Sequence, residues 1–467
     1  MGKIAKNVTT SPQPSAMIDP VEACHRMSRP RVLVFPLTLL VCSLAVLAAE
    51  PARHVVLISI DGLRPSSYTS AAPAKIPTLR ALAARGAFAR GVIGVLPTVT
   101  YPSHTTMITG VPPAIHGIIN NTWLDPEGRA AGAWYWYARD IKVPTLPVLI
   151  RASGMTSAAV SWPVTVGMDL DYNVPEHFRS RHPEALSLLR ALSTPRHLID
   201  GYENSLPAPM PWPPTDDQRV GLTAWIIRTF KPNFTMLHIF DNDTASHEFG
   251  PDSPEALAAL ERNDAQVATI LDAVRDAGLT DRTDVVIVSD HGFVTLQTQL
   301  QPNFAFKQDG LIQVNDRGVV TTWDAYMQSS GGSGFVYLKR PGDEALVARV
   351  RRVLDAIVAD PANGVDRLWT REDLKRAGAA PEATFALLMK PGFYTGTAHT
   401  VLLQPTIGKG GHGFEPTLPA LHASLIMTGP DVSKSGDLGI VRMTQLAPTL
   451  ARWFGVRLSE EADQPLW

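Results

Sequence analysis

Three long apolar runs in this sequence each lead into acidic residues, and no other feature constrains the fold as strongly. The runs cover residues 54–60, 233–240 and 284–289, and they are followed by Asp61, Asp241, Asp243 and Asp290. Runs of β-branched residues without polar alternation are typical of parallel strands that are buried on both faces of a sheet. Parallel strands end at one edge of their sheet, which is also where α/β folds bind ligands. The sequence therefore predicts an α/β fold that brings several carboxylates to its functional edge.

Helices are expected between and after these strands, which makes the predicted fold doubly wound. They are expected at residues 76–85, 145–151, 254–277 (capped by Ser253) and 443–454. The main sheet is expected to resume at residues 423–427. Residues 175–220 are expected to be less regular, with an irregular loop at the proline-rich stretch 207–214.

Residues 295–405 lack this alternation and are expected to form an inserted α+β subdomain. Strands are expected there at residues 335–338 and 384–389, with an amphipathic helix at residues 343–359 between them. The sequence thus predicts one large domain, residues 50–467, that carries one insertion.

Residues 1–49 are expected to be an N-terminal extension and signal peptide. Arg26, Arg29 and Arg31 precede residues 32–49, which carry no formal charge and end in small residues. A segment counted from Met27 has the proportions of a normal signal peptide, so we expect the natural start at Met27. The alternative is an uncleaved membrane anchor, because eighteen uncharged residues approach the length that spans a bilayer. Pro36 and the small residues favour cleavage, and therefore a periplasmic or secreted protein that contacts a membrane only if the segment is uncleaved.

Charge and cysteine content narrow the possible partners. Lys and Arg number 42 and Asp and Glu 44, which gives a formal net charge of −2. Without a basic field to hold a phosphate backbone, no stable nucleic-acid complex is expected.

Both cysteines, Cys24 and Cys42, lie in the predicted N-terminal extension and signal peptide, residues 1–49. An exported domain would then depend on its core alone, which a chain of this size can supply.

Six carboxylates and imidazoles near strand ends and turns form a candidate metal-ligand set. They are Asp61, Asp243, His247, Asp290, His291 and His412. Mixed carboxylate and imidazole ligands suit Zn²⁺, with Mn²⁺ as a possible substitute, and six ligands are enough for two ions. Taken singly, each residue has a plain structural explanation; an Asp at a helix start is commonly a cap. Their convergence on one sheet edge favours a site.

A nucleophile is expected in the hydroxyl-rich segment 96–110. Thr98, Thr100 and Ser103 are all candidates, and their spacing does not choose among them. A Ser/Thr-rich turn that opens a helix, with Ser103 as its cap, is the structural alternative.

Short motifs in a fixed order carry a family resemblance. They are Ile-Asp-Gly at 60–62, Pro-Thr-Val-Thr-Tyr-Pro-Ser-His at 97–104, Gly-Ile-Ile-Asn-Asn at 117–121, Asp-Thr-Ala-Ser-His at 243–247, Ser-Asp-His-Gly at 289–292 and Gly-His-Gly at 411–413. Together they resemble the nucleotide pyrophosphatase/phosphodiesterase family of the alkaline phosphatase superfamily, over roughly residues 54–460. The resemblance implies an alkaline-phosphatase-like, mostly parallel sheet with helices on both faces.

The resemblance also assigns roles to residues. It implies that Thr100 is the nucleophile and that Asn121 helps to hold the phosphoryl oxygen. One zinc ion would be held by Asp61, Thr100, Asp290 and His291, and the other by Asp243, His247 and His412. His104 and His116 fall in the motifs but are expected to be structural.

The sequence departs from the family pattern at two positions. Ser103 stands where the family usually has Asn, and His238 stands where many members have a Tyr that stacks on a nucleobase. Tyr101 is expected to supply a stacking face instead, with His238 as a less effective opposite wall. We therefore expect substrate binding by Tyr101, Asn121 and His238, with modest nucleotide selectivity.

These features predict an exported, metal-dependent phosphodiesterase or nucleotide pyrophosphatase that acts on a small phosphodiester or nucleotide. A phosphomonoesterase of the same superfamily and a phosphodiesterase of phospholipid head groups are the alternatives. A sulfatase would need a Cys/Ser-x-Pro-x-Arg segment, which the predicted mature sequence lacks. A non-catalytic binding protein would be expected to lose ligands, yet every expected ligand is present.

Overall fold

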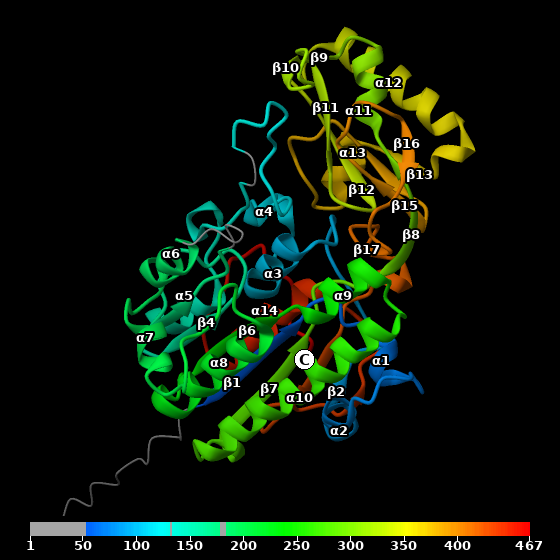
Figure 1. Cartoon of the computed structure of the whole chain (residues 1–467). Coiled ribbons are helices and arrows are strands. Elements are labelled where there is room, and N and C mark those ends of the chain that lie inside the picture. Colours follow the sequence, from blue (N-terminus) through cyan, green and yellow to red (C-terminus); the bar gives the residue numbers. More distant parts are fainter. Residues whose placement is uncertain (1–52, 131–132, 178–183) are drawn as a thin grey trace, which may run out of the picture. The chain divides into compact units, whose positions relative to one another are not determined.

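A mixed, mostly parallel sheet of eight strands lies at the centre of the computed structural model (Figure 1), which describes residues 53–130, 133–177 and 184–467. From one edge to the other the strands are β19 (Gly436–Asp437), β2 (Ala87–Phe88), β18 (Leu425–Thr428), β7 (Thr283–Val288), β1 (His54–Ile60), β6 (Phe234–Ile239), β4 (Ser157–Val160) and β5 (Tyr172–Val174). The strands from β7 to β5 pair in parallel, and β18 joins β7 antiparallel. The predicted α/β fold is confirmed, including the return of the chain to the main sheet at β18.

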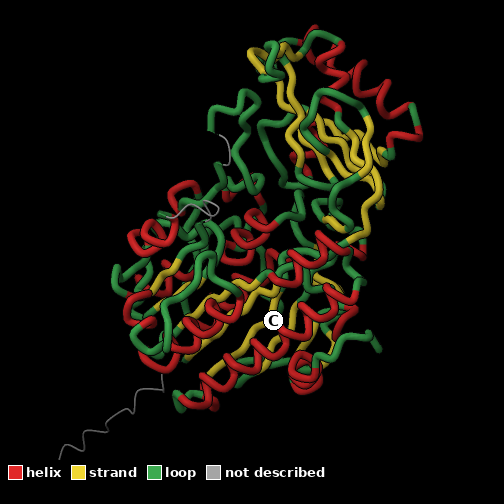
Figure 2. The backbone as a smooth tube through the Cα atoms, viewed as in Figure 1, coloured by secondary structure: helices red, strands yellow, loops and turns green. Residues whose placement is uncertain are grey.

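Helices cover both faces of this sheet (Figure 2). On one face lie α2 (Pro77–Arg85), α8 (Asp216–Phe230) and α10 (Pro254–Asp276), and on the other lie α3 (Thr100–Thr109), α5 (Leu146–Ala152) and α14 (Leu446–Phe454). The side chains of β1 alternate between the two cores, with Val56 and Ile58 in one and Val55 and Leu57 in the other. This central strand, which is mostly apolar, is thus buried on both sides, as its sequence predicts.

Residues 175–220 contain more regular structure than expected. Helices α6 (Ala185–Leu192) and α7 (Leu198–Glu203) form there, and α8 begins at Asp216. Leu189 and Leu198 pack into the core beside β5 and α8, and a capping box between Thr215 and Gln218 starts α8. These helices have eight and six residues, so a helical period repeats about twice at most and is hard to recognise beside the many proline residues of this region.

The segment after β7 builds further sheets with a core of their own. Strands β11 (Ala325–Ser329), β12 (Ser333–Leu338), β14 (Phe385–Met389) and β13 (Val365–Thr370) form an antiparallel sheet in that order. Helices α11 (Pro302–Gln308) and α12 (Glu344–Ala359) contribute to its core, together with β8 (Val294–Leu300). The boundaries of the inserted subdomain, about residues 295–405, remain a prediction.

The turn between β11 and β12, residues 330–333, packs against the segment that carries His412. The amide of Gly332 donates to the carbonyl oxygen of His412 at 2.8 Å. A Cβ atom on Gly332 would lie 2.1 Å from the ring of Phe414. Gly413 has a φ of +85°, and a Cβ atom there would lie 1.7 Å from the carbonyl oxygen of Ser330. Only glycine allows this close approach of two backbones.

The predicted signal segment, residues 1–49, lies outside the described residues. Among the residues that are described, no helix combines the length and the apolar character that crossing a bilayer requires.

Candidate active site

Six predicted ligand residues gather near the carboxyl ends of the central strands. Asp61 directly follows β1, and Asp290 and His291 follow β7. Helix α9 (Asp241–Phe249) starts just after β6 and carries Asp243 and His247 one turn apart. His412 arrives from the segment after β17 (Gly410–Gly411), which pairs with β8. Parallel pairing of β1 with β6 and β7 is what brings residues distant in sequence together here.

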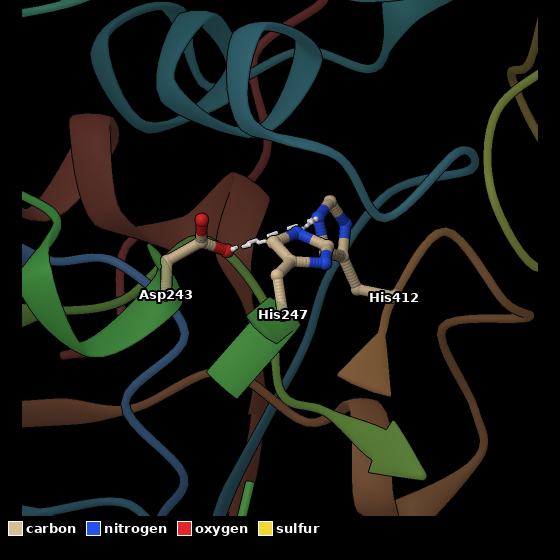
Figure 3. Close-up of side chains that lie close together, drawn as sticks. All are labelled: Asp243, His247 and His412. Carbon is tan, nitrogen blue, oxygen red and sulfur yellow. Dashed lines mark hydrogen bonds and ion pairs between the residues drawn. The ribbon is translucent and has the colours of Figure 1, made fainter. Parts of the chain in front are cut away.

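Asp243, His247 and His412 form the first of two groups whose ligand atoms lie within 4.8 Å of one another (Figure 3). The Nε2 atom of His247 lies 3.4 Å from Asp243 Oδ1 and 3.1 Å from His412 Nε2. The Nδ1 atoms of both rings face backbone carbonyl oxygens, at 3.0 Å in His247 and 2.9 Å in His412. With each Nδ1 facing an acceptor, the two Nε2 atoms are left facing each other. A cation between them resolves this arrangement, so the group fits a metal ion.

Asp61, Asp290 and His291 form the second group. The Nε2 atom of His291 lies 3.1 Å from Asp290 Oδ2 and 3.4 Å from Asp61 Oδ1. These three buried atoms have no hydrogen-bond partner among the described residues. The Nδ1 atom of His291 again faces a carbonyl oxygen, that of Gly292, at 3.2 Å. Buried polar atoms are normally paired, so the three inward-facing atoms fit a second ion.

The electrostatics of the two groups are mixed. Burial, and then the charges of Asp243 and Asp290, raises the pKa of Asp61 well above its usual range. Burial, and then the charges of His291 and His247, lowers the pKa of His412 well below its usual range. In contrast, burial is outweighed by the opposite charges of Asp290 and His291, so that the pKa of Asp290 is held well below its usual range and the pKa of His291 is raised to about 9. The crowding of Asp61 by other carboxylates and the neutral ring of His412 are features that a divalent cation relieves.

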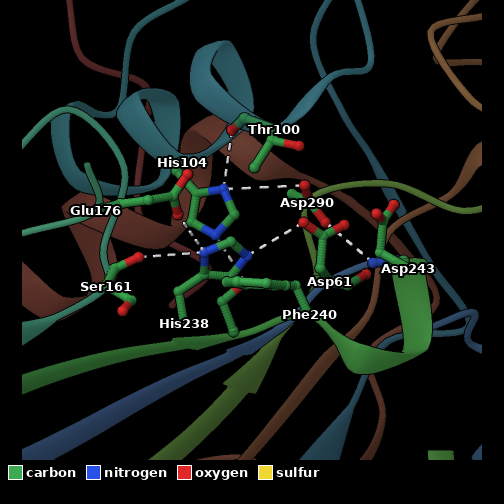
Figure 4. Close-up of polar contacts among 12 residues, drawn as sticks. Asp61, Thr100, His104, Ser161, Glu176, His238, Phe240, Asp243 and Asp290 are labelled. Atoms are coloured by element: carbon green, nitrogen blue, oxygen red, sulfur yellow. Dashed lines mark hydrogen bonds and ion pairs between the residues drawn. The ribbon is translucent and has the colours of Figure 1, made fainter. Parts of the chain in front are cut away.

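Of the three candidate hydroxyl residues, Thr100 is the one that is not fully buried. It occupies the first turn of α3, close to Asp290, and is partly exposed (Figure 4). Thr98 is fully buried, and its hydroxyl donates to the carbonyl oxygen of Phe414 at 2.8 Å. Ser103 is also fully buried. The N-terminus of α3 adds a partial positive charge, which favours an anion beside Thr100.

Asn121 is held with its amide group available. Its Oδ1 atom accepts a hydrogen bond from the backbone amide of Tyr101 at 2.9 Å. Its own backbone amide donates to Asn120 Oδ1 at 2.8 Å. Because the oxygen is engaged next to Thr100, the Nδ2 group is left to donate to a ligand.

The structure contradicts the predicted stacking roles of Tyr101 and His238. Tyr101 is 0% exposed, because its ring points into a core and its hydroxyl donates to Glu176 Oε1 at 2.9 Å. His238 is 1% exposed and lies between Asp61 and Glu176. The aromatic surface at this place is Trp134, which packs on Tyr101 at 5.1 Å between ring centroids and is itself 36% exposed.

The two remaining motif histidines have internal partners. His104 Nδ1 lies 2.8 Å from the carbonyl oxygen of Thr100, and its Nε2 atom lies 2.9 Å from Ser59 Oγ. The amide of Ile118 donates to His116 Nδ1 at 3.1 Å.

Two residues near the site, Glu176 and Trp134, were not predicted from the sequence. Glu176 lies at the start of a proline-rich region without a motif, and Trp134 lies within a cluster of aromatic residues that could equally be core.

Comparisons with known sequences identify relatives of the chain. A sequence model described as Type I phosphodiesterase / nucleotide pyrophosphatase matches residues 55–411. Human ectonucleotide pyrophosphatase/phosphodiesterase family member 1 is 26% identical over 247 residues, which are 51% of this chain and 23% of that protein. The venom phosphodiesterase of Macrovipera lebetinus is 24% identical over 250 residues, 51% of this chain and 25% of that protein. The chain thus spans about a quarter of the length of these relatives.

Solved structures with the same fold are also found. Human ectonucleotide pyrophosphatase / phosphodiesterase 5 superposes with a TM-score of 0.65 at 19% identity, covering 89% of this chain and 98% of that one. The murine protein, solved in complex with AMP, superposes with a TM-score of 0.64 at 18% identity and the same coverage. These likenesses establish an alkaline-phosphatase-like arrangement of strands and helices.

Proposed function

The chain belongs to the type I phosphodiesterase / nucleotide pyrophosphatase family, and on this basis we propose that it hydrolyses phosphodiester or pyrophosphate bonds with Thr100 as its nucleophile and two zinc ions as cofactors. The observation that carries the proposal is the pair of ligand groups beside Thr100, whose inward-facing nitrogen and oxygen atoms lack hydrogen-bond partners or face one another. Small phosphodiesters and nucleotides are the proposed substrates.

Each proposed ion has its own ligands. Asp61, Thr100, Asp290 and His291 would hold one ion, and Asp243, His247 and His412 would hold the other. Carboxylate and imidazole donors with Nδ1 bound to backbone carbonyls suit zinc, and manganese is a possible substitute. When bound, the ions lower the pKa of a nearby hydroxyl and offset negative charge on a phosphoryl group.

The residues of the chain account for the two chemical steps. The Thr100 oxygen attacks phosphorus, and the bond from phosphorus to the leaving oxygen breaks, which leaves a phosphothreonine ester. Asn121 Nδ2 would donate to a non-bridging oxygen as charge builds on it. Water then attacks the same phosphorus, and the ester bond to Thr100 breaks, which restores the hydroxyl.

A preference for diesters over monoesters is the test of the proposed function. A monoester carries an additional negative charge, and beyond the two ligand groups the matching sequence segments offer no third set of carboxylates to hold a charge-neutralising cation. A diester has a second substituent, for which the exposed ring of Trp134 offers a stacking surface worth about 1 kcal/mol. We expect kcat/KM for bis-p-nitrophenyl phosphate to exceed that for p-nitrophenyl phosphate, and Trp134→Ala to raise KM for a nucleotide diester about fivefold. A ratio below one would move the protein to the phosphomonoesterases.

Trp123→Ala is the matched control for this measurement. Trp123 lies near Trp134 in the sequence and is 43% exposed. Its ring stacks on Tyr135, at 4.2 Å between ring centroids, rather than on Tyr101. Its removal should leave the diester KM close to that of the wild type. A high diester ratio that Trp134→Ala leaves unchanged would keep the activity and discard the stacking surface.

Export is the remaining part of the proposal. It is supported by the basic residues before the uncharged run 32–49 and by the small residues that end it. Sequencing the N-terminus of the protein made in a secreting host should find a start between Ala48 and Glu50. Recovery from the membrane after a high-salt wash, with residues 32–49 intact, would instead favour an anchor.

A further inference from the structure

Two buried side chains, the carboxylate of Glu176 and the imidazole of His238, form a chain of contacts that ends on Asp61 (Figure 4). Glu176 is 5% exposed and follows β5, whereas His238 is 1% exposed and lies within β6. His238 Nδ1 lies 3.0 Å from Glu176 Oε2, and His238 Nε2 lies 3.1 Å from Asp61 Oδ2. Neither residue belongs to the ligand set that the family resemblance implies.

Both ring nitrogens of His238 face hydrogen-bond acceptors. Besides Glu176, the Nδ1 atom faces the carbonyl oxygen of Ser161 at 3.2 Å, and Nε2 faces the carboxylate of Asp61. The ring is therefore held between two carboxylates, with an acceptor within hydrogen-bond distance of each of its nitrogens.

The surroundings hold this ring in one orientation. His104 and Phe240 pack against it, at 4.4 Å and 5.4 Å between ring centroids. Ser161 presents its carbonyl oxygen from a left-handed backbone conformation with a φ of +52°. A non-glycine residue keeps such a conformation only where its neighbours over-determine it, which is a feature of functional sites.

The contact with His238 decides which oxygen of Asp61 faces the metal group. Oδ2 is engaged by His238, whereas Oδ1 faces His291 and has no hydrogen-bond partner among the described residues. We propose that Glu176 is a positioning residue: it holds His238 so that His238 orients the Asp61 carboxylate toward its zinc ion. This inference rests on the proposed function, because it concerns a ligand of the proposed zinc pair. Partners of this kind behind a ligand commonly account for a 10- to 100-fold difference in metal affinity.

Glu176 has a second partner, which supplies a control. Its Oε1 atom accepts from the hydroxyl of Tyr101, the residue after Thr100, at 2.9 Å. Glu176→Gln replaces one of the two oxygens that Tyr101 and His238 contact with an NH2 group, which leaves His238 Nδ1 with the carbonyl oxygen of Ser161 at 3.2 Å as its remaining sure acceptor. Tyr101→Phe removes only the first of these hydrogen bonds and leaves the contact between Glu176 and His238 in place.

The test is a two-site zinc titration of the metal-stripped full chain by competition with a chromophoric chelator. In Glu176→Gln, one of the two zinc dissociation constants should rise about 10- to 100-fold, while the other stays at its wild-type value. Tyr101→Phe should keep both constants near wild type. If Glu176→Gln does not fold, His238→Asn, which is too short to span Asp61 and Glu176, should weaken the same single site.

The outcomes separate this inference from the proposed function. Two wild-type zinc constants in Glu176→Gln would overturn the positioning role alone. Equal weakening of both sites, together with a lower melting temperature of the metal-free protein, would mean that Glu176 is only structural and would also overturn it. A wild-type chain that binds no zinc would overturn the proposed function, and this inference with it.

Discussion

Thr100→Ala should lower kcat/KM for a phosphodiester by at least about a thousandfold, because the first covalent step has no other acceptor at this place. Thr98 is buried and bonded to Phe414, and Ser103 is buried one helical turn away. Neither hydroxyl can replace the Thr100 oxygen without a rearrangement of α3. The measurement is steady-state hydrolysis, accompanied by mass spectrometry of the rapidly quenched wild type to detect a phosphorylated or nucleotidylated Thr100 peptide.

Ser103→Ala is the control for this variant. The Ser103 hydroxyl has no hydrogen-bond partner among the described residues, so its loss breaks no contact while the same helix is altered. Its turnover should stay near wild type, and Thr98→Ala should also keep most activity. An inactive Thr98→Ala variant with normal folding, beside an active Thr100→Ala variant, would show that the nucleophile has been assigned to the wrong threonine.

Loss of a metal ion should also lower the activity strongly. The wild type is expected to contain two zinc ions per chain, and His412→Ala to contain one, with activity reduced by more than about a hundredfold. The loss follows because His412 Nε2 and His247 Nε2 face each other at 3.1 Å, and one imidazole alone leaves that ion without a full set of ligands. Elemental analysis and activity after dialysis against a chelator measure both quantities.

His197→Ala is the matched control, since the His197 side chain is 90% exposed and lies on a different part of the chain. It should retain two ions and full activity. An enzyme that is free of transition metals and insensitive to chelators, yet active, would contradict the zinc pair.

The central sheet could be predicted from the sequence because its long strands are mostly apolar runs, and each run leads into an acidic residue. The run 54–60 is apolar except for His54 and Ser59, and the observed strand β1 has these bounds. The ligand residues follow from the same signal, since parallel strands place Asp61, Asp243 and Asp290 at one edge whatever their spacing in sequence. Helices such as α6, which has eight residues, were missed because they are too short for a helical period to repeat more than about twice.

The direction of side chains at the site could not be predicted in the same way. Tyr101 follows Thr100 on a helix, where successive side chains point about 100° apart, so an accessible Thr100 leaves Tyr101 facing the core. His238 lies on a central strand that is buried on both faces, which removes it from any substrate surface. The proposed role of Glu176 depends on a fold that brings the segment after β5 past the end of β4 to His238 on β6, a contact across 62 residues.

Residues 330–333 contact the segment of His412 through glycines, and this contact links a proposed metal ligand to another sheet. His412 and the turn between β11 and β12 therefore belong to one cooperative unit. Gly332 and Gly413 leave no space for the two backbones to slide, so freeing His412 requires opening of the turn between β11 and β12. Local opening takes place in such contiguous units rather than residue by residue. A ligand that binds only the closed state lowers the population of the open state by mass action. Zinc held by His412 would therefore protect amide hydrogens of β11 and β12 from exchange, although neither strand supplies a ligand.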